Sequence, residues 1–530
     1  MTRSTFPDVE IPELSIYDFL FGGLTPDDLD VTALVDGTSG AKTSYGELLA
    51  QINAVAGALA ARGVNTETTI GLLCPNAPAF AVVFHGILRA GAVVTTINSL
   101  YTAEEIANQL RDAGATWLFT VSPLLAGAEA AAAEVGIDAD HLIVMDGVDG
   151  HPSLKDLIME QATPPEVSFD PATHLAVLPY SSGTTGRPKG VMLTHRNLVA
   201  NVAQSEVNIG VQTGDVVLAV LPFYHIYGLT VLLNFALKTR STLVTMPRFD
   251  LPEFLRIIQE QKCTWLFIAP PIAVALAKHP IVDQYDLSSV KAIFSGAAAL
   301  DENLAGAVAK RLNTTVRQGY GMTETSPVSH TIPLDRDDIS LSTIGLAIPN
   351  LESKLVDPET GEEIPQPESG TSEPGELMCK GPNIMMGYLN NEEATRATLT
   401  EDGWLHTGDI ATVDSNGVYR IVDRLKELIK YKGYQVAPAI LESLLLTHPK
   451  VADAAVIGVL DDDGQEIPKA FVVIQPGEEL TETEVMDFVT AKVAPHEKVR
   501  RVEFIDVIPK STAGKILRKD LRVRETAKAS

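Results

Sequence analysis

The chain has 530 residues, with 41 Lys and Arg against 68 Asp and Glu and a formal net charge of −27. Its length predicts roughly two to four folding units, and a hydrophobic content of 45% excludes a disordered chain. The net charge excludes a general nucleic-acid binder and disfavours adsorption to anionic membranes, since both need a basic surface. It leaves room for a local basic pocket that takes a phosphorylated small molecule.

Cysteine usage and the ends of the chain favour a cytoplasmic protein. Cys74, Cys263 and Cys379 are widely spaced and form no CxxC pair, which indicates neither a disulfide framework nor a zinc site. No apolar run reaches the ~18 residues that span a bilayer. The N-terminus lacks a secretion signal, and the C-terminal KAS is not a peroxisomal address. We therefore expect a cytoplasmic location.

From the N-terminus onward, short β-rich runs alternate with helical patterns, which is typical of an α/β fold. Ser44 and Glu47 form a capping-box pattern, and apolar residues at helical spacing follow as far as Leu59. The apolar runs that predict buried strands lie at residues 69–73, 117–121, 142–145, 175–179, 216–221, 243–246 and 265–269. We expect a large N-terminal domain of several subdomains, with β-sheets flanked by helices.

Two charged segments interrupt this alternation. Residues 357–376 contain seven acidic and no basic residues, and they predict an exposed, mobile loop. The charged pentapeptide 423–427 separates strands predicted at 418–422 and 428–431. We place a domain boundary there, so that 1–423 form the N-terminal domain, 424–427 a hinge and 428–530 a small α+β domain. Residues 424–530 carry 17 basic and 17 acidic residues, so the whole negative excess lies before the hinge.

Residues 181–190, SSGTTGRPKG, combine glycines, hydroxyls and a lysine directly after the strand predicted at 175–179. Glycines let backbone N–H groups approach an anion, hydroxyls add donors, and a lysine supplies charge. The pattern predicts a phosphate cradle formed by Ser181, Ser182, Gly183, Thr184, Thr185, Gly186 and Lys189. It is not a Walker A loop, which needs GK[ST] at the start of a helix. The alternative is a flexible turn.

The segment SSGTTGRPKG resembles the phosphate-binding signature of the adenylate-forming superfamily. That family includes acyl-CoA synthetases, 4-coumarate–CoA ligases, beetle luciferases and the adenylation domains of peptide synthetases. Further blocks follow in the family's order at residues 318–324 (QGYGMTE), 403–409 (GWLHTGD), 422–438 and 509–515 (PKSTAGK). The block at 422–438 is most similar to the 4-coumarate–CoA ligase and luciferase branch. The resemblance implies an N-terminal adenylation domain, which binds AMP, and a mobile C-terminal lid.

The resemblance also implies a site for ATP and Mg²⁺. Gln318, Gly319 and Tyr320 would line the adenine site. Thr323 would contact phosphate, and Glu324 would hold Mg²⁺, an ion that prefers hard carboxylate oxygens. Taken singly, these residues have plainer explanations, namely a strand-end turn and an exposed surface acid.

Two further blocks complete the implied nucleotide site. Asp409 would accept hydrogen bonds from the ribose hydroxyls, and Arg424 would reinforce that contact. Lys426 is placed at the hinge. Lys515 would reach over the N-terminal domain to stabilise the pentavalent transition state, because neutralising charge on the transferred phosphoryl is the strongest effect available to such enzymes. The alternatives are a turn aspartate, a solvated charge run and a mobile tail lysine.

Lysines recur at alternate positions between residues 426 and 432. If the strand is continuous, alternation places Lys426, Lys430 and Lys432 on one face; the alternative is a solvated edge that lysines protect from aggregation. The resemblance places Lys430 near the adenylate and gives Gln435 a catalytic role. The coenzyme A channel is assigned to Lys432, Gly433 and Arg248.

The implied acyl site centres on His225, which lies among apolar and aromatic residues. A lone histidine there is commonly a satisfied core residue, whereas the resemblance places it at the mouth of the site, where it orients the carboxylate. The lining implied by the family is Tyr227, Val231, Phe294, Ala297, Gly321, Pro327 and Val328. Small residues and flat aromatics suit a planar aryl acid such as cinnamate. Phe294 replaces a slimmer residue of many coumarate ligases and Ala299 a usual proline, so a medium- or long-chain fatty acid is the alternative.

These blocks predict an ATP-dependent acid–CoA ligase with two half-reactions. A carboxylic acid of the cinnamate or 4-coumarate type attacks ATP, pyrophosphate leaves, and the acyl group then passes from acyl-AMP to coenzyme A. ATP, Mg²⁺ and coenzyme A are the expected cofactors, and no nucleic acid, membrane or protein partner is implied. The competing interpretations are an amino-acid adenylation domain, a luciferase-like oxygenase and a catalytically silent adenylate-binding or scaffold protein.

Overall fold

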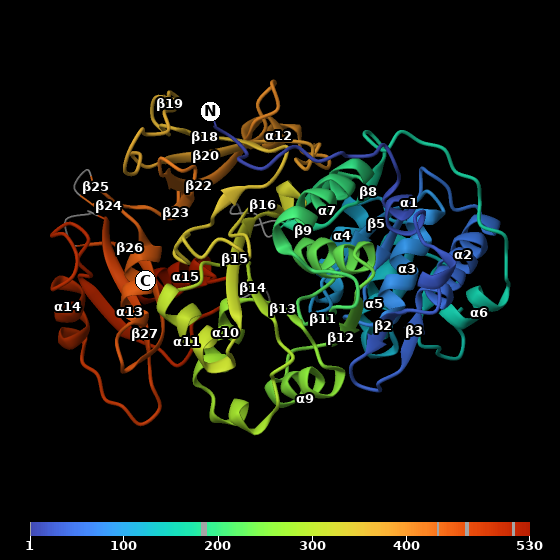
Figure 1. Ribbon diagram of the computed structural model, residues 1–530, viewed down its shortest axis with the longest axis horizontal. Helices are drawn as coiled ribbons and strands as arrows, with labels where there is room; N and C mark the ends of the chain where they lie inside the picture. Colours follow the sequence, from blue (N-terminus) through green and yellow to red (C-terminus); the bar gives the residue numbers. More distant parts are fainter. Residues whose placement is uncertain (1, 182–187, 432–433, 462–465, 511–514, 530) are drawn as a thin grey trace.

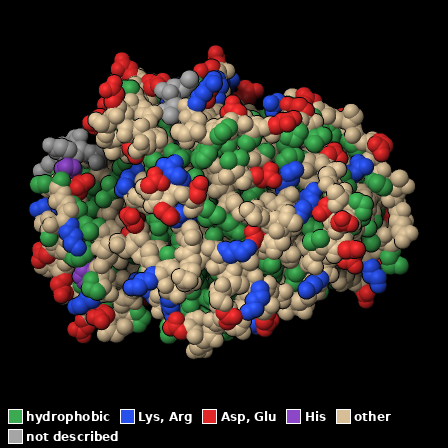
Figure 2. All heavy atoms as spheres, in the orientation of Figure 1, with side chains coloured by type: hydrophobic (Ala, Val, Ile, Leu, Met, Phe, Trp, Pro, Cys, Tyr) green, Lys and Arg blue, Asp and Glu red, His purple; other side chains and the backbone are tan. Residues whose placement is uncertain are grey.

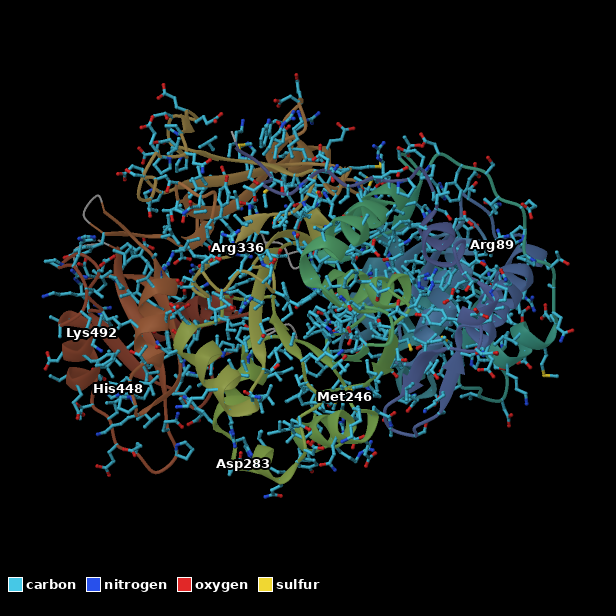
Figure 3. All side chains as sticks on the ribbon, viewed as in Figure 1. Arg89, Met246, Asp283, Arg336, His448 and Lys492 are labelled. Carbon is cyan, nitrogen blue, oxygen red and sulfur yellow. The ribbon has the colours of Figure 1, made fainter. Side chains whose placement is uncertain are left out.

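The computed structural model describes residues 2–181, 188–431, 434–461, 466–510 and 515–529. In Figure 1, strands β26 and β27 with helices α13 and α14 gather at one end of the molecule, and helices α2, α3 and α6 lie at the other. His448 and Lys492 mark the first end and Arg89 the second (Figure 3). Acidic and basic side chains are interspersed over the face shown in Figure 2.

The largest sheet assembles the middle of the chain. Its strands run parallel from β15 to β2, and antiparallel strands close both ends. The order is β17 (Leu346–Ala347), β16 (Val328–Thr331), β15 (Thr315–Gly321), β14 (Ala292–Ser295), β13 (Trp265–Ile268), β11 (Val216–Ala219), β12 (Thr242–Thr245), β2 (Thr32–Asp36) and β3 (Lys42–Ser44). Because the carboxyl ends of parallel strands share one edge, residues that follow β14 and β15 lie side by side.

A second sheet gathers the N-terminal part of the chain. Its order is β21 (Gly387–Tyr388), β10 (Lys189–Thr194), β8 (Leu175–Val177), β5 (Val93–Thr96), β4 (Thr69–Leu72), β6 (Trp117–Thr120) and β7 (Leu142–Val144), and β9 (Tyr180–Ser181) also pairs with β10. All the buried strands that the apolar runs predict are therefore confirmed in these two sheets. The predicted capping box is confirmed as well, since Glu47 N–H donates to the Ser44 hydroxyl at 3.2 Å at the start of α2.

Helices cover the sheets and connect their strands, as expected for an α/β fold. In the N-terminal part they are α1 (Ile16–Phe21), α2 (Tyr45–Ala61), α3 (Pro78–Arg89), α4 (Ala103–Asp112), α5 (Leu125–Val135), α6 (Leu154–Met159), α7 (His195–Ile209), α8 (Phe235–Lys238), α9 (Leu251–Gln261), α10 (Pro270–Lys278), α11 (Glu302–Leu312) and α12 (Glu392–Thr398). Within the described part of the chain, no helix is both long and apolar enough to cross a membrane.

A third, antiparallel sheet corrects one local prediction. Its order is β1 (Thr2–Arg3), β18 (Glu352–Val356), β20 (Gly375–Lys380), β22 (Leu405–Val413) and β23 (Tyr419–Arg424), and β19 (Glu363–Ile364) pairs with β18. The acidic segment 357–376 is thus not wholly a loop, because it contains β19 and the start of β20, where Glu376 is 7% exposed. A turn at 425–427 separates β23 from β24, as the charged pentapeptide predicts, so Lys426 lies outside both strands and the condition for a single lysine face is not met.

The C-terminal region has a hydrophobic core of its own, centred on Leu441, Val456, Val472 and Val485. Its strands are β24 (Ile429–Tyr431), β25 (Tyr434–Val436), β26 (Val451–Leu460), β27 (Glu466–Ile474) and β28 (Arg501–Phe504), and its helices are α13 (Pro438–Leu446), α14 (Glu482–Thr490) and α15 (Arg518–Ala529). A large α/β body with a smaller α+β domain is therefore confirmed. The division at 424–427 stays a prediction.

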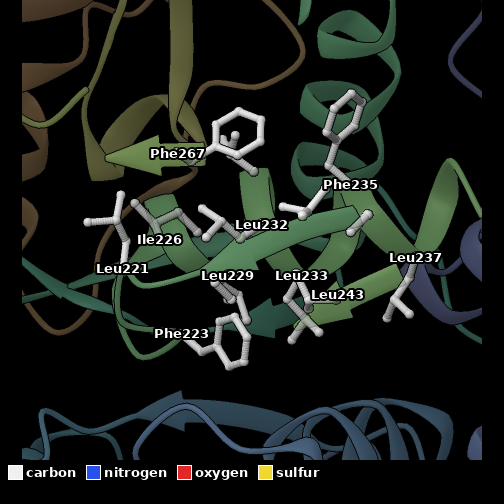
Figure 4. Close-up of a cluster of buried hydrophobic side chains, with 14 of the residues drawn as sticks. Leu221, Phe223, Ile226, Leu229, Leu232, Leu233, Phe235, Leu237, Leu243 and Phe267 are labelled. Carbon is white, nitrogen blue, oxygen red and sulfur yellow. The ribbon is translucent and has the colours of Figure 1, made fainter. Parts of the chain in front are cut away.

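The segment after β11 carries a π-helix, η4 (Tyr227–Asn234), deep in the core. Figure 4 shows Leu229, Leu232 and Leu233 of this helix among other buried apolar side chains, including Phe223 and Phe267. In a π-helix each backbone hydrogen bond spans one residue more than in an α-helix, and such helices are frequently found at functional sites. Here the π-helix fixes the backbone positions of Tyr227 and Val231.

Asn76 ties the first two sheets together just ahead of that segment. It follows β4, is 3% exposed, and donates from Nδ2 to the carbonyls of Ala219 at 3.0 Å and Leu221 at 2.8 Å. Its Oδ1 accepts from Phe223 N–H at 2.8 Å. One side chain thus satisfies three backbone groups where residues 219–223 pass from β11 towards His225.

We expect Asn76→Ala to lower the free energy of unfolding by about 3 kcal/mol, because it leaves buried backbone groups without partners. Urea-induced unfolding measures the change. Asn65→Ala is the matched control: Asn65 is exposed, its bonds are local, and water replaces them, so we expect a change below about 0.5 kcal/mol. Equal losses of unfolding free energy in the two variants would contradict the role of Asn76 in joining the two sheets.

Candidate active site

One pocket opens where the ends of β14 and β15 face the segment after β11. Its lining is His225, Ile226, Tyr227, Val231, Phe294, Gly296, Ala297, Gly319, Tyr320, Gly321, Met322, Thr323, Pro327, Val328 and Lys515, around about 520 Å³ of empty space. Every residue predicted to line the acyl site is present. So are His225 and Lys515, which are 290 positions apart in the chain. Ile226, Gly296 and Met322 were not predicted, since nothing in their local sequence distinguishes them.

Three glycines keep the pocket narrow and flat. A Cβ on Gly319 would lie 2.9 Å from the Phe294 ring, and one on Gly296 would lie 2.6 Å from the Tyr227 ring. A Cβ on Gly321 would lie 2.0 Å from the Pro327 carbonyl oxygen, closer than any real contact. These positions therefore require glycine, and the walls they form are backbone rather than side chain.

Asn201 and Asn383 hold the wall that carries Pro327 and Val328. The side chain of Asn201 pairs with both backbone groups of Val328, at 2.8 and 3.1 Å. Asn383 donates to the carbonyls of Thr325 at 2.8 Å and Val328 at 3.1 Å. Sequence reasoning missed both asparagines, because their role depends on contacts between distant segments.

Asp409 lies at the junction of the first and third sheets. It is 5% exposed, accepts a hydrogen bond from the Tyr320 hydroxyl at 2.5 Å, and lies 3.3 Å from Arg424 Nε. Asp409 and Arg424 are also cross-strand partners on β22 and β23. Burial and the Asp409 carboxylate raise the pKa of Tyr320 well above its usual value, so the phenol stays a neutral donor.

Gln318 does not line the pocket. Its Oε1 accepts from Leu300 N–H at 3.1 Å, and its Nε2 donates to the carbonyls of Thr343, at 2.8 Å, and Leu341. Its side chain is 5% exposed and is used entirely in holding neighbouring backbone. Gln318 thus positions the strand end that carries Gly319 and Tyr320.

Glu324, the predicted magnesium ligand, is 6% exposed and lies just beyond the strand end of β15. Its Oε1 accepts from the Tyr388 hydroxyl at 2.8 Å. Lys189 from the predicted phosphate loop lies over the Tyr388 ring, with Nζ 4.6 Å from the centroid. Tyr388 therefore links the lysine and the carboxylate predicted to contact phosphates and Mg²⁺. It follows no recognisable motif, and sequence reasoning missed it.

Lys515 brings a positive charge from the C-terminal domain into the pocket. Burial and the nearby Arg424 lower its pKa, and the carboxylates of Asp409 and Glu324 oppose that shift. Burial, followed by the charge of Lys515, lowers the pKa of His225 to about 4, so the imidazole is neutral at pH 7. Its Nδ1 accepts from Tyr227 N–H at 3.3 Å, which places the ring proton on Nε2.

Several predicted residues lie elsewhere. Arg248 is exposed between β12 and α9, Lys426 is exposed on the turn at 425–427, and neither lines the pocket. Ser181 is half-buried on β9, paired with Lys189 on β10. Outside the described residues lie Ser182, Gly183, Thr184, Thr185, Gly186, Lys432 and Gly433, and the side chains of Lys430 and Gln435 are likewise not described.

Comparison with known proteins identifies the family to which this chain belongs. The family model of AMP-binding enzymes matches residues 26–389, and that of the AMP-binding enzyme C-terminal domain matches residues 441–515. The 4-coumarate–CoA ligase 5 of Oryza sativa subsp. japonica is 42% identical to this chain over 535 residues, which cover 99% of this chain and 97% of that protein.

Solved structures of similar shape include the anthranilate CoA ligase AuaEII in complex with anthranoyl-AMP. It has a TM-score of 0.89 and 28% identity, with 98% of this chain and 99% of that chain covered. ATP-bound MatB from Rhodopseudomonas palustris has a TM-score of 0.88 and 30% identity, with 97% of this chain and 99% of that chain covered.

We expect Tyr388→Phe to raise the Mg²⁺ concentration for half-maximal pyrophosphate release by roughly three- to ten-fold, since the Glu324 carboxylate loses a donor that orients it. A Mg²⁺ titration at saturating ATP measures this. Tyr45→Phe is the control, because Tyr45 is also buried but donates to Ser241 in the core, away from the pocket. An equal shift in both variants would show that Tyr388 acts only on stability.

Proposed function

The chain belongs to the AMP-binding enzyme family and is an AMP-forming acid–CoA ligase, and we propose that its acid is a flat aryl carboxylic acid of the cinnamate type. The observation that carries the proposal is the flat pocket that the ends of β14 and β15 form beneath Lys515. ATP, coenzyme A and the acid are then its substrates, with Mg²⁺ as the metal.

The residues present fit ATP and Mg²⁺. The slot around Gly319 and Gly321 has no room for side chains and offers the Tyr320 ring as an apolar face for adenine. The Asp409 carboxylate lies beside it and suits a ribose diol. Among the described residues no three metal-ligating side chains cluster, so Glu324 would hold Mg²⁺ together with nucleotide oxygens, as is usual for this ion. The ion would neutralise charge on the phosphates.

Lys515 and His225 suit the first half-reaction. The acid's carboxylate attacks the α-phosphorus of ATP, the bond to the leaving phosphate breaks, and pyrophosphate departs. Lys515 stabilises the charge that develops on the transferred phosphoryl. Neutral His225 donates from Nε2 and orients the carboxylate without adding charge.

The second half-reaction requires the C-terminal domain to move. We propose that residues 428–530 swing about Lys426 as a lid, which removes Lys515 and brings Lys430, Lys432, Gly433 and Gln435 to the site, with Arg248 beside the coenzyme A channel. The thiol of coenzyme A then attacks the acyl carbonyl, and AMP leaves. A lid that serves both steps explains why the C-terminal region has a hydrophobic core of its own and follows the charged turn at 425–427.

The lining of the pocket favours an aryl acid. Lys515 is the one residue with a formal charge among those described around it, so nothing pairs with the ammonium of an amino acid. The Tyr227 ring packs against Gly296, the Phe294 ring packs against Gly319, and Gly321 faces the Pro327 backbone, so flat rings and backbone form the walls of a slot. A slot of this kind suits a conjugated planar acid.

We further propose a cytoplasmic location. The three cysteines are free and buried, which fits a reducing compartment. Small molecules are the partners that the site supports, and no protein partner is implied.

We expect Lys515→Ala to slow acyl-adenylate formation by roughly 10²- to 10³-fold, because the transition-state charge loses its cation. Thioester formation from a supplied acyl-adenylate should change less than about two-fold. Single-turnover assays of each half-reaction measure both. Lys519→Ala is the control, because Lys519 is an exposed lysine four residues further on. Equal losses in the two half-reactions would contradict the lid assignment.

The acid itself is tested by ATP-dependent acyl-CoA formation over cinnamates, benzoates and fatty acids, read by mass spectrometry. We expect cinnamates to give a kcat/KM at least about ten-fold above that of fatty acids, because one misplaced methylene in an apolar pocket already costs about 1–3 kcal/mol. A preference for fatty acids would overturn the aryl assignment. Light emission with a luciferin, or no pyrophosphate release with any acid, would overturn the ligase.

A further inference from the structure

A buried carboxylate spans the predicted hinge outside the active site. Asp423 lies on β23, immediately before residues 424–427, and is 3% exposed. Its Oδ2 accepts from the backbone N–H of Ala439 at 2.8 Å, and its Oδ1 accepts from Arg424 N–H at 2.6 Å. Ala439 is the second residue of α13, behind Pro438. The carboxylate on the body therefore caps the first helix of the C-terminal domain.

The neighbouring charged groups act on Asp423 through their charge, but their own hydrogen bonds and ion pairs do not reach the body. Glu442 accepts from Val456 N–H at 2.8 Å and from Arg518 at 2.6 Å, all beyond residue 427. Glu427 pairs with Arg522 of α15. Rotation about Lys426 leaves these contacts intact, whereas the bond from Ala439 to Asp423 joins two parts that rotation moves relative to one another.

We propose that Asp423 is a positioning residue that clamps the C-terminal domain in the orientation in which Lys515 lines the pocket. The inference rests on the proposed two-step function, since a clamp matters only if the domain moves. Ile410, the cross-strand partner of Asp423, belongs to a buried apolar cluster with Leu428 and Ala437.

The chemistry of the clamp makes it specific for one orientation. A buried carboxylate is stable only where donors or positive charge compensate for lost hydration. Here two backbone N–H groups, the N-terminus of α13 and the nearby guanidinium of Arg518 do so, against the repulsion of Glu427. When the domain rotates, Ala439 leaves and Asp423 must be hydrated again. The clamp thus raises the population of the adenylating orientation.

The test uses the full chain with dyes on Lys310→Cys in α11 and Glu482→Cys in α14, both exposed positions. The native cysteines are buried, so labelling is selective. Single-molecule energy transfer with ATP and Mg²⁺ reports the lid orientation without any acid. We expect Asp423→Asn to lower the ratio of adenylating to other orientations roughly ten-fold, since a charge-assisted bond is lost and an amide donor faces an N–H.

The matched control is Glu442→Gln, the same acid-to-amide change in the same cluster, whose hydrogen bonds all lie within the lid. Its charge only repels Asp423, so the variant should lower thermal stability without lowering the orientation ratio. In parallel, Asp423→Asn should slow adenylation about ten-fold while thioester formation from a supplied acyl-adenylate stays equal or rises.

Two results would overturn the clamp: an unchanged orientation ratio in Asp423→Asn, or the same shift in Glu442→Gln. If the wild-type protein forms acyl-CoA, and Asp423→Asn changes neither the orientation ratio nor the rate of adenylation, the proposed function stands and the clamp fails. If no acid is activated, energy transfer with ATP alone still decides the clamp.

Discussion

The hydrogen bond from Tyr320 to Asp409 is the contact on which the site depends, because it joins the parallel sheet to the antiparallel sheet. Tyr320 lies at the end of β15, and Asp409 lies on β22 beside Arg424 of β23. The strand that ends at the pocket and the strand that leads to the C-terminal domain are thereby held together. A displacement of β23 would therefore shift Tyr320, which lines the pocket.

Charge is distributed so that the pocket receives its cation from outside the body. The body carries the whole net charge of −27, and its carboxylates Asp409 and Glu324 favour the charged form of Lys515. Burial and Arg424 act in the opposite direction. The net result is a lowered pKa, so the cost of burying the Lys515 ammonium exceeds the stabilisation that the two carboxylates give it. The neutral imidazole of His225 adds no charge to this balance.

Much of the fold and of the pocket lining could be predicted from sequence, because buried strands and motif blocks are local patterns. The apolar runs at 69–73 and 265–269 became β4 and β13. The side-chain contacts of Gln318, Asn76 and Tyr388 could not be predicted, since each joins segments that are distant in the chain. The break between β23 and β24 could also be predicted, because the turn at 425–427 lies within the charged run at 423–427.

The π-helix η4 gives the pocket a way to change shape that needs no substitution of its lining. Each hydrogen bond of a π-helix spans one residue more than in an α-helix, so deleting one residue from Tyr227–Asn234 would favour regular α-helical winding. The leucines that anchor the helix in the core would then be out of register with Tyr227 and Val231. A one-residue insertion or deletion in this helix would therefore reshape the pocket with every lining residue type unchanged.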